Sequence, residues 1–262
     1  MQGDYHMKML IFYVSLFSIL NTIDYTAKAS QDNRLLFFTE EFPPYNFKFN
    51  SIKRSIDGIS VRVLEKMHKV MKKDEKDFKM ELGIWARGYN LAQKRGKKVV
   101  LFITARTDAR ENLFKWVGPI TSTTLSLIKR VDSKAVVKSK DDFSKYKYCV
   151  IKKDLGEFLI REEKVKDEQI ISKTKVKDIL SMLLDKQCDF FVYDYRVAVW
   201  LMKQLSFDKN DFAAEYTLKK TSTYFAFNKS IPDEIVKEYQ NALDTLVKNN
   251  PNLIAEIEAQ FQ

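Results

Sequence analysis

Short apolar runs alternate along the chain with segments in which apolar residues recur at helical spacing. Near-continuous apolar runs predict buried strands, because a strand inside a parallel sheet is covered on both faces. Such runs occupy residues 34–39, 99–103, 148–151 and 190–193. Helical spacing follows the first run, up to Met71, and recurs between Val176 and Leu183. Strands that alternate with helices predict an α/β fold, here built from two successive α/β units.

Two further helices are expected at the C-terminal end. Ser230 is the expected N-cap of the first, whose first turn holds Pro232 and Asp233. Asn250 and Pro251 are expected to open the second. The apolar residues of each helix fall on one face, which is typical of helices that pack against a core; they are Ile235, Tyr239, Leu243, Leu246, Leu253, Ile257 and Phe261.

Residues 1–29 have the pattern of a secretory signal peptide. Lys8 precedes an apolar stretch at residues 9–20, and the Ala-Lys-Ala sequence at residues 27–29 fits the site that signal peptidase recognises. Cleavage is expected before Ser30. The mature chain is therefore expected to be exported and soluble in the periplasm.

Two alternatives stay open at the N-terminus. The apolar stretch is shorter than the roughly 20 residues that span a bilayer, but a retained membrane anchor is the competing interpretation. Asp4, which is acidic, and His6 precede Lys8, and this order is unusual for a signal peptide. Translation could therefore start at Met7 rather than Met1.

Composition and charge argue against a nucleic-acid partner. Hydrophobic residues make up 45% of the chain and charged residues 31%, as in ordinary soluble globular proteins. The formal net charge is +10, but the basic residues are interleaved with acidic ones, as in residues 72–77. A nucleic-acid-binding protein is expected to concentrate its positive charge in a stripe or a recognisable motif.

The two cysteines, Cys149 and Cys188, could form a disulfide in an oxidising compartment. The alternative is two small buried side chains on neighbouring strands. A metal site is not expected, because the only histidines are His6, in the signal segment, and His68, within a helical pattern.

A family resemblance is carried by residues 104–111, Thr-Ala-Arg-Thr-Asp-Ala-Arg-Glu, followed by Phe-Lys-Trp-Val-Gly-Pro-Ile at residues 114–120. This segment resembles the family 3 extracellular solute-binding proteins, whose best-known members deliver polar amino acids to ABC importers. Four more segments resemble pieces of that family in the same order: residues 41–45, 57–60, 85–89 and 188–194. The resemblance extends from about Leu35 to Phe261.

This resemblance implies a two-lobed periplasmic-binding-protein-like fold of type II, with two crossover strands and a ligand cleft between the lobes. Residues 30–120 and 222–262 are expected to form lobe 1, and residues 121–221 lobe 2. In open α/β sheets the ligand binds at the carboxyl ends of the strands.

The resemblance also assigns two charged ligand contacts. Arg110 aligns with the arginine that holds the α-carboxylate of an amino acid, a task suited to the planar guanidinium fork. A surface arginine paired with Asp108 or Glu111 is the alternative. Asp194 aligns with the acid that accepts hydrogen bonds from the ligand's ammonium group, with a structural pair to Arg196 as its alternative.

Four aromatic residues are candidates for the walls of the cleft, with burial in the core as the alternative for each: Phe42, Tyr45, Trp85 and Tyr89.

The sequence departs from the amino-acid binders at the positions where they place small hydroxyl residues. The nearest residues here are Ile103, Ala105, Asp154 and Leu155. Donors at a helix start favour an anion, and the carboxylate of Asp154 would oppose one. We therefore expect a ligand other than an ordinary α-amino acid.

The function expected from the sequence is an exported solute-binding protein, monomeric and without a cofactor. It would bind a small polar ligand, either an amino acid or another small carboxylate or amine, for an ABC permease in the inner membrane. A ligand-sensing module for a membrane receptor is the first alternative, and an enzyme of the same fold, such as a dehydratase, is the second. No nucleophile with an adjacent base, metal-ligand cluster or phosphate loop indicates catalysis.

Overall fold

The computed structural model describes residues 34–49 and 55–261 of the chain. The predicted signal peptide and its cleavage site lie outside the described residues, as does His6. Residues Arg34–Gln262 form one compact unit.

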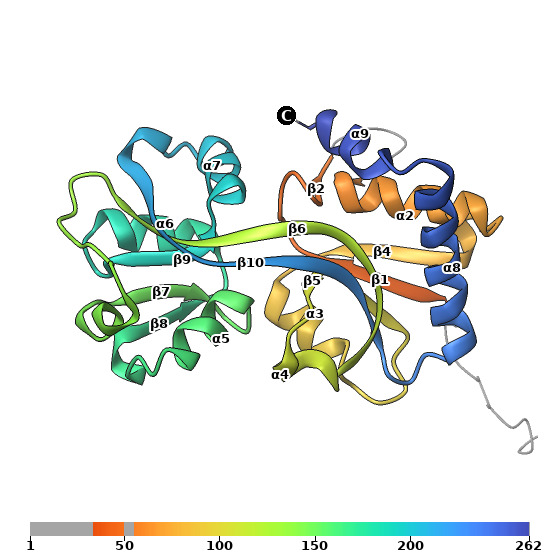
Figure 1. The fold of residues 1–262 in the computed structure, drawn as a ribbon, viewed down its shortest axis with the longest axis horizontal. Helices are drawn as coiled ribbons and strands as arrows, with labels where there is room; N and C mark the ends of the chain where they lie inside the picture. The colour runs from red at the N-terminus through yellow and green to blue at the C-terminus, as the bar shows by residue number, and fades with distance from the viewer. Residues whose placement is uncertain (1–33, 50–54, 262) are drawn as a thin grey trace, which may run out of the picture. The chain divides into compact units, whose positions relative to one another are not determined.

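An eight-stranded sheet runs through this unit in the order β4-β1-β5-β10-β6-β9-β7-β8 (Figure 1). At one end β1 pairs in parallel with β4 and β5, and at the other β7 pairs in parallel with β8 and β9. The strands of the first group are β1 (Leu35–Thr39), β4 (Phe78–Leu82) and β5 (Val99–Ala105). Those of the second are β7 (Tyr148–Ile151), β8 (Ile170–Lys173) and β9 (Phe190–Asp194).

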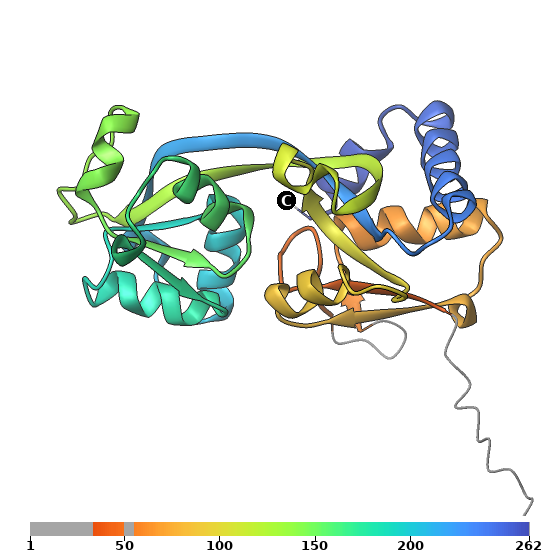
Figure 2. The same cartoon turned by 90° about the horizontal axis from the view of Figure 1, so that it is seen from below.

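Two long strands connect the two groups. β6 (Phe114–Arg130) and β10 (Phe212–Asn228) each have 17 residues and pair antiparallel along their length, from Phe114 with Asn228 to Arg130 with Phe212. β10 pairs with β5 in the first group, and β6 pairs with β9 in the second. Figures 1 and 2 show both strands passing side by side from one lobe to the other. These are the two crossover strands predicted from the sequence.

The helices are placed around the two strand groups (Figure 1). Those next to the first group are α2 (Ile59–Val70), α3 (Trp85–Leu91), α4 (Asp108–Glu111), α8 (Asp233–Asn249) and α9 (Leu253–Ala259). Those next to the second group are α5 (Leu155–Glu162), α6 (Val176–Leu184) and α7 (Tyr195–Gln204). A two-stranded sheet of β2 (Phe47–Lys48) and β3 (Ile56–Asp57) and the short 3₁₀ helices Glu75–Asp77, Lys140–Lys145, Asp167–Gln169 and Lys209–Asp211 complete the described elements.

The apolar runs in the sequence become the buried centre of each group. Phe37 in β1 is fully buried, with the rings of Phe102 and Phe227 edge-on at centroid distances of 5.8 and 6.4 Å. In the second group Tyr148 and Phe190, from neighbouring strands, are fully buried and stacked at 5.8 Å. The four predicted strands are confirmed as β1, β5, β7 and β9. Their burial agrees with their continuous apolar sequences.

The edge strands β4 and β8 were not predicted. Their sequences, Phe-Lys-Met-Glu-Leu and Ile-Ile-Ser-Lys, mix charged or polar residues with apolar ones, and all but one of their residues are partly exposed. The edge of a sheet is covered on fewer sides, so the sequence there carries no long apolar run.

The C-terminal helices are confirmed, but their predicted starts are wrong. α8 begins at Asp233 with Pro232 at the N-cap position and no side-chain cap. Ser230 instead accepts a hydrogen bond from the Gly96 N–H at 2.8 Å, which ties it to another loop. α9 begins at Leu253 rather than at Pro251, after a turn in which the Asn250 side chain accepts from the Asn252 N–H.

The structure joins Cys149 to Cys188 in a disulfide with a Cα–Cα distance of 6.0 Å. Cys149 lies in β7, and Cys188 lies two residues before β9. Both side chains are buried. In the described part of the chain, no group of three or more histidine, cysteine or acidic residues is arranged to hold a metal ion. No helix among the described residues is long and apolar enough to cross a membrane.

Candidate functional site

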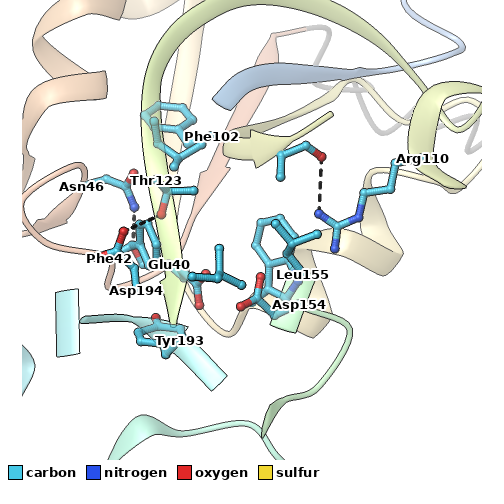
Figure 3. Close-up of a pocket in the computed structure, with 14 residues that line it drawn as sticks. Glu40, Phe42, Asn46, Phe102, Arg110, Thr123, Asp154, Leu155, Tyr193 and Asp194 are labelled. Carbon is cyan, nitrogen blue, oxygen red and sulfur yellow. Dashed lines mark hydrogen bonds between the residues drawn. The ribbon is translucent and has the colours of Figure 1, made fainter. Parts of the chain in front are cut away.

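A small cavity of about 30 Å³ lies where the two strand groups face one another (Figure 3). The first group contributes residues beyond the end of β1, from the last part of β5, and from α3 and α4. The second contributes the start of α5 and the end of β9, and the crossover strand β6 contributes Thr123 and Leu125. The carboxyl ends of the parallel strands thus meet here, as expected for an open α/β sheet. The lining residues are Glu40, Phe42, Asn46, Trp85, Phe102, Ile103, Ala105, Arg110, Thr123, Leu125, Asp154, Leu155, Tyr193 and Asp194.

Arg110 is buried in this wall, with 1% of its surface exposed. Its Nη2 donates to the Lys153 carbonyl oxygen at 3.1 Å, and its Nη1 is 3.5 Å from the Ala105 carbonyl oxygen. Its Nε has no hydrogen-bond partner among the residues that the structure describes. Burial lowers the pKa of Arg110, while the nearby Asp154 carboxylate opposes that change. Three aromatic rings face the guanidinium: Phe158 at 5.0 Å, Tyr89 at 5.2 Å and Trp85 at 5.8 Å.

Arg110 is not a surface arginine paired with Glu111, which was the alternative interpretation. The neighbouring Arg106 makes the ion pair with Glu111, with Nη2 and Oε1 2.6 Å apart, and both side chains are exposed. The alternation of exposed Arg106 and buried Arg110 follows from α4, which turns Arg110 inward.

Asp194 is also buried at the cavity, but its carboxylate already has three protein donors. Oδ2 accepts from the Thr123 hydroxyl at 2.6 Å and from the Thr124 N–H at 3.0 Å. Oδ1 accepts from the Val197 N–H at 3.1 Å, which makes Asp194 the N-cap of α7. Arg196 donates to the Tyr45 hydroxyl instead of pairing with Asp194.

Two other acids face one another across the cavity, Glu40 from beyond β1 and Asp154 from the N-cap of α5 (Figure 3). Burial raises the pKa of Glu40 well above its ordinary value, and the charge of Asp154 raises it further. Burial also raises the pKa of Asp154, although Arg110 acts in the opposite direction. Two carboxyl groups in one enclosed space disfavour double ionisation.

Tyr193, near the end of β9, has 1% of its surface exposed, and in the described part of the chain its hydroxyl has no hydrogen-bond partner. Its ring is held by Phe191, stacked at 4.8 Å, and by Phe42, edge-on at 5.6 Å. Burial raises the pKa of Tyr193, and the neighbouring carboxylates add to this, so the hydroxyl keeps its proton and can donate it. In the described residues three buried side-chain polar atoms lack a partner, and two of them belong to Tyr193 and Arg110 at this cavity.

The four predicted aromatic residues divide into two pairs. Phe42 and Trp85 line the cavity. Tyr45 and Tyr89 lie behind it: Tyr45 is stacked on Phe42 at 5.3 Å, and Tyr89 is tilted against Trp85 at 5.8 Å. The predicted walls are therefore built in two layers, of which only the first reaches the cavity.

Four residues stand nearest to the positions at which the resemblance led us to expect small hydroxyl residues. All four line the cavity: Ile103, Ala105, Asp154 and Leu155. Ile103 has a φ of 43°, in the left-handed region that a β-branched residue rarely adopts. Such strain concentrates at functional sites, where the surrounding structure holds it in place.

Sequence reasoning missed Glu40 and Tyr193 as site residues. Glu40 directly follows the first predicted strand and Tyr193 is the last residue of the fourth, so both occupy strand ends. Asp194 was favoured because ligands bind at the carboxyl ends of the strands, and this reason applies equally to Glu40 and Tyr193. Thr123 was also missed, because its role depends on a hydrogen bond to Asp194, a residue 71 positions away.

A wider groove of about 1130 Å³ lies between α7 and the C-terminal residues, lined in part by Trp200, Phe207 and Phe261. None of the unpartnered buried polar atoms found in the described part of the chain belongs to this groove. The enclosed cavity, where such atoms gather, is therefore the better candidate for a polar ligand.

The sequence matches no protein-family model and no protein of curated function. Solved structures do resemble it. A histidine kinase sensor domain with similarity to periplasmic binding proteins has a TM-score of 0.74 at 16% identity, covering 87% of this chain and 96% of the other. An amino acid ABC transporter substrate-binding protein from Streptococcus pneumoniae, bound to L-arginine, has a TM-score of 0.68 at 18% identity, covering 87% and 94%. The GluR0 ligand-binding core with L-glutamate has a TM-score of 0.70 at 14% identity, covering 87% and 97%.

These likenesses bear on the fold. Of these three neighbours one is a sensor domain, and the other two are solved with an amino acid bound. The resemblance inferred from the sequence is thus confirmed at the level of three-dimensional structure. The protein has the two-lobed α/β fold of the periplasmic binding proteins, with two crossover strands and a cleft between the lobes.

Proposed function

We propose that the protein is an exported, monomeric solute-binding protein that binds a small polar ligand in the cavity and delivers it to an ABC permease in the inner membrane. One observation carries this proposal. Two buried polar atoms that lack a partner among the described residues, Tyr193 Oη and Arg110 Nε, belong to side chains that line the same cavity. An unpaired buried polar group costs about 1–3 kcal/mol, so a ligand that supplies its hydrogen bonds gains that energy on binding.

The lobes close around the ligand in this proposal. A cavity of about 30 Å³ has room for only a few atoms, whereas small-molecule sites usually enclose about 300–1,000 Å³. Binding therefore requires the lobes, residues 30–120 with 222–262 and residues 121–221, to separate and close again by bending β6 and β10. Lys153 of the second lobe holds the closed form in two ways: its carbonyl accepts from Trp85 Nε1 at 2.9 Å, and its ammonium donates to Asn90 at 2.6 Å.

Arg110 and Asp194 have different parts in the proposed site. Arg110 is the only cationic side chain that lines the cavity within the described residues, so it would hold a carboxylate if the ligand carries one. Asp194, with three donors already in place, positions Thr123 and the start of α7 and accepts at most a further hydrogen bond from the ligand.

A sensory role is the second candidate, favoured by the structural likeness to a histidine kinase sensor domain. Both roles need the same ligand-binding step and differ in the partner protein. Genes for a permease and an ATPase beside the coding sequence would support uptake, whereas a gene for a histidine kinase would support sensing.

A thermal-shift screen of amino acids, small carboxylates, amines and short peptides tests the binding function. A ligand at 100 times its dissociation constant stabilises the protein by about 2.7 kcal/mol. For a chain of this size the melting temperature should rise by about 5–10 °C. A panel without any such rise would contradict the proposal.

Tyr193→Phe tests the location of the site with the strongest ligand of the panel. The variant keeps the ring packing and removes the free hydroxyl, so we expect at least a fivefold loss of affinity, equivalent to about 1 kcal/mol. Tyr195→Phe is the matched control, because the Tyr195 hydroxyl contacts the Phe212 carbonyl outside the cavity. Equal affinities in the two variants would place the ligand elsewhere.

Export is tested separately by mass spectrometry of protein recovered from the cell envelope. The proposal predicts a mature N-terminus at or near Ser30, and an intact 9–20 segment in that protein would contradict it.

A further inference from the structure

The cavity carries more acidic than basic groups. Among the described residues, Glu40, Asp154 and Asp194 line it against a single cation, Arg110, which gives a formal charge of −2 when all four are ionised. The nearby Lys153 ammonium is directed away, to the Asn90 side chain at 2.6 Å. A ligand with positive charge is therefore complementary to this space, and a net anion is not.

Asp154 supplies Arg110 with a negative partner from within the protein. The Asp154 charge favours the charged form of Arg110, and Arg110 lowers the pKa of Asp154 against the effect of burial. A ligand carboxylate directed at Arg110 would have to approach the Asp154 carboxylate, and like charges in an enclosed site repel.

The other side of the cavity offers two carboxyl groups and a hydroxyl, all of which can accept hydrogen bonds from a cation. The Glu40 carboxylate receives no hydrogen bond from the described residues, and its backbone carbonyl accepts from Asn46 and Thr39. Asp154 makes no side-chain capping bond in α5, although the first amides of the helix favour its ionised form. Beside them the Tyr193 hydroxyl is buried and unpartnered, which is an independent sign that a polar ligand completes the site.

We propose that the ligand is an organic dication that lacks a carboxylate, such as a diamine or a guanidinoalkylamine, with a cationic group bound between Glu40 and Asp154. This inference rests on the proposed binding function and specifies its ligand. Two positive charges neutralise the cavity, which a zwitterionic amino acid with one net positive charge does not. The rings of Phe42, Trp85 and Phe102 line the same space and suit the methylene chain and the cationic ends of such a ligand.

Binding of this ligand is linked to protons. Glu40 and Asp154 are harder to ionise than free carboxyl groups, so a cation that enters between them displaces protons. The other titratable groups that face the pair are Arg110 from α4, Tyr193 and Asp194 from β9, and Glu157 from α5. Affinity for the amine should rise with pH until the amine itself loses its proton near pH 10.

Calorimetric titration of the full chain with matched pairs tests the inference. Agmatine differs from arginine, and putrescine from ornithine, by one α-carboxylate. We expect the amine to bind at least tenfold more tightly than the amino acid in at least one of these pairs. Equal or tighter binding of the amino acids would overturn the inference and leave the proposed function standing. Binding of only neutral or anionic compounds would do the same, and binding of nothing in the whole screen would overturn both.

Two substitutions sharpen the test. Asp154→Thr keeps a good N-cap residue and frees Arg110, so the preference should move at least tenfold toward the amino acid of each pair. Glu40→Gln should weaken amine binding at least tenfold. The neighbouring Glu41→Gln is the control, because Glu41 accepts from the Lys48 N–H and does not line the cavity. An unchanged ligand preference in Asp154→Thr, or equal losses in Glu40→Gln and Glu41→Gln, would contradict the inference.

Discussion

His68 should make the protein acid-sensitive. Its side chain is 3% exposed, and Nε2 lies 3.0 Å from the Tyr239 hydroxyl, while Nδ1 has no hydrogen-bond partner within residues 34–49 and 55–261. Burial, aided by the charge of Lys73, lowers the pKa of His68 from 6.5 to about 4. The unfolded chain therefore binds a proton that the folded protein excludes, and the free energy of unfolding falls as the pH drops from about 6.5 to about 4. At about pH 4.5 the loss from this one residue is about 2.5 kcal/mol.

Urea unfolding of the parent protein and of His68→Gln at about pH 7.5 and pH 4.5 measures this loss. The glutamine cannot gain the proton and retains polar atoms near Tyr239, so its unfolding free energy should fall by about 2.5 kcal/mol less than that of the parent. Tyr239→Phe keeps the histidine and removes its hydroxyl partner; it should lose about 1 kcal/mol at both pH values. The same acid-induced loss in His68→Gln and in the parent would refute this reasoning.

Three other properties should respond to single changes. Reduction of the disulfide between Cys149 and Cys188, which lie 39 residues apart, should destabilise the protein by about 4 kcal/mol, measured by urea unfolding with and without reductant. Gly58→Ala should cost about 2 kcal/mol or more, because Gly58 has a φ of 132° and an added Cβ would lie 2.3 Å from the Tyr45 carbonyl oxygen; an unchanged melting temperature would contradict this. The raised pKa of Glu40 means that the folded, ligand-free protein binds more protons than the unfolded chain above the ordinary glutamate pKa, so this residue's contribution makes stability fall as pH rises. Glu40→Gln should remove that contribution. If the free energy of unfolding of this variant varies with pH as that of the parent does, Glu40 makes no such contribution.

The strands and helices were largely predictable because their signals are local. The apolar runs at β1, β5, β7 and β9 and the helical spacing of α2 and α6 each lie within about a dozen residues. The crossover strands β6 and β10 were placed by the family resemblance, because their 17 residues mix apolar, hydroxyl and charged side chains as the strands pass between the lobes.

The position of the candidate cavity was predictable, but only some of its lining residues were. Arg110, Asp194, Phe42 and Trp85 were predicted to be site residues and line the cavity. The opposition of Glu40 and Asp154 depends on how two distant segments meet, which no local pattern encodes. For the same reason the sequence could not show that Asp194 is already satisfied by Thr123 and two backbone amides.

The proposed function requires that a small polar ligand binds between the lobes, in contact with both. A crystal structure of the protein with the strongest ligand of the thermal-shift screen tests this directly. We predict a ligand enclosed between the lobes, in contact with Glu40 from beyond β1 and Asp154 at the start of α5, with a hydrogen bond to the Tyr193 hydroxyl. A ligand bound instead in the groove beside Trp200 and Phe261, or on the surface of one lobe, would contradict it.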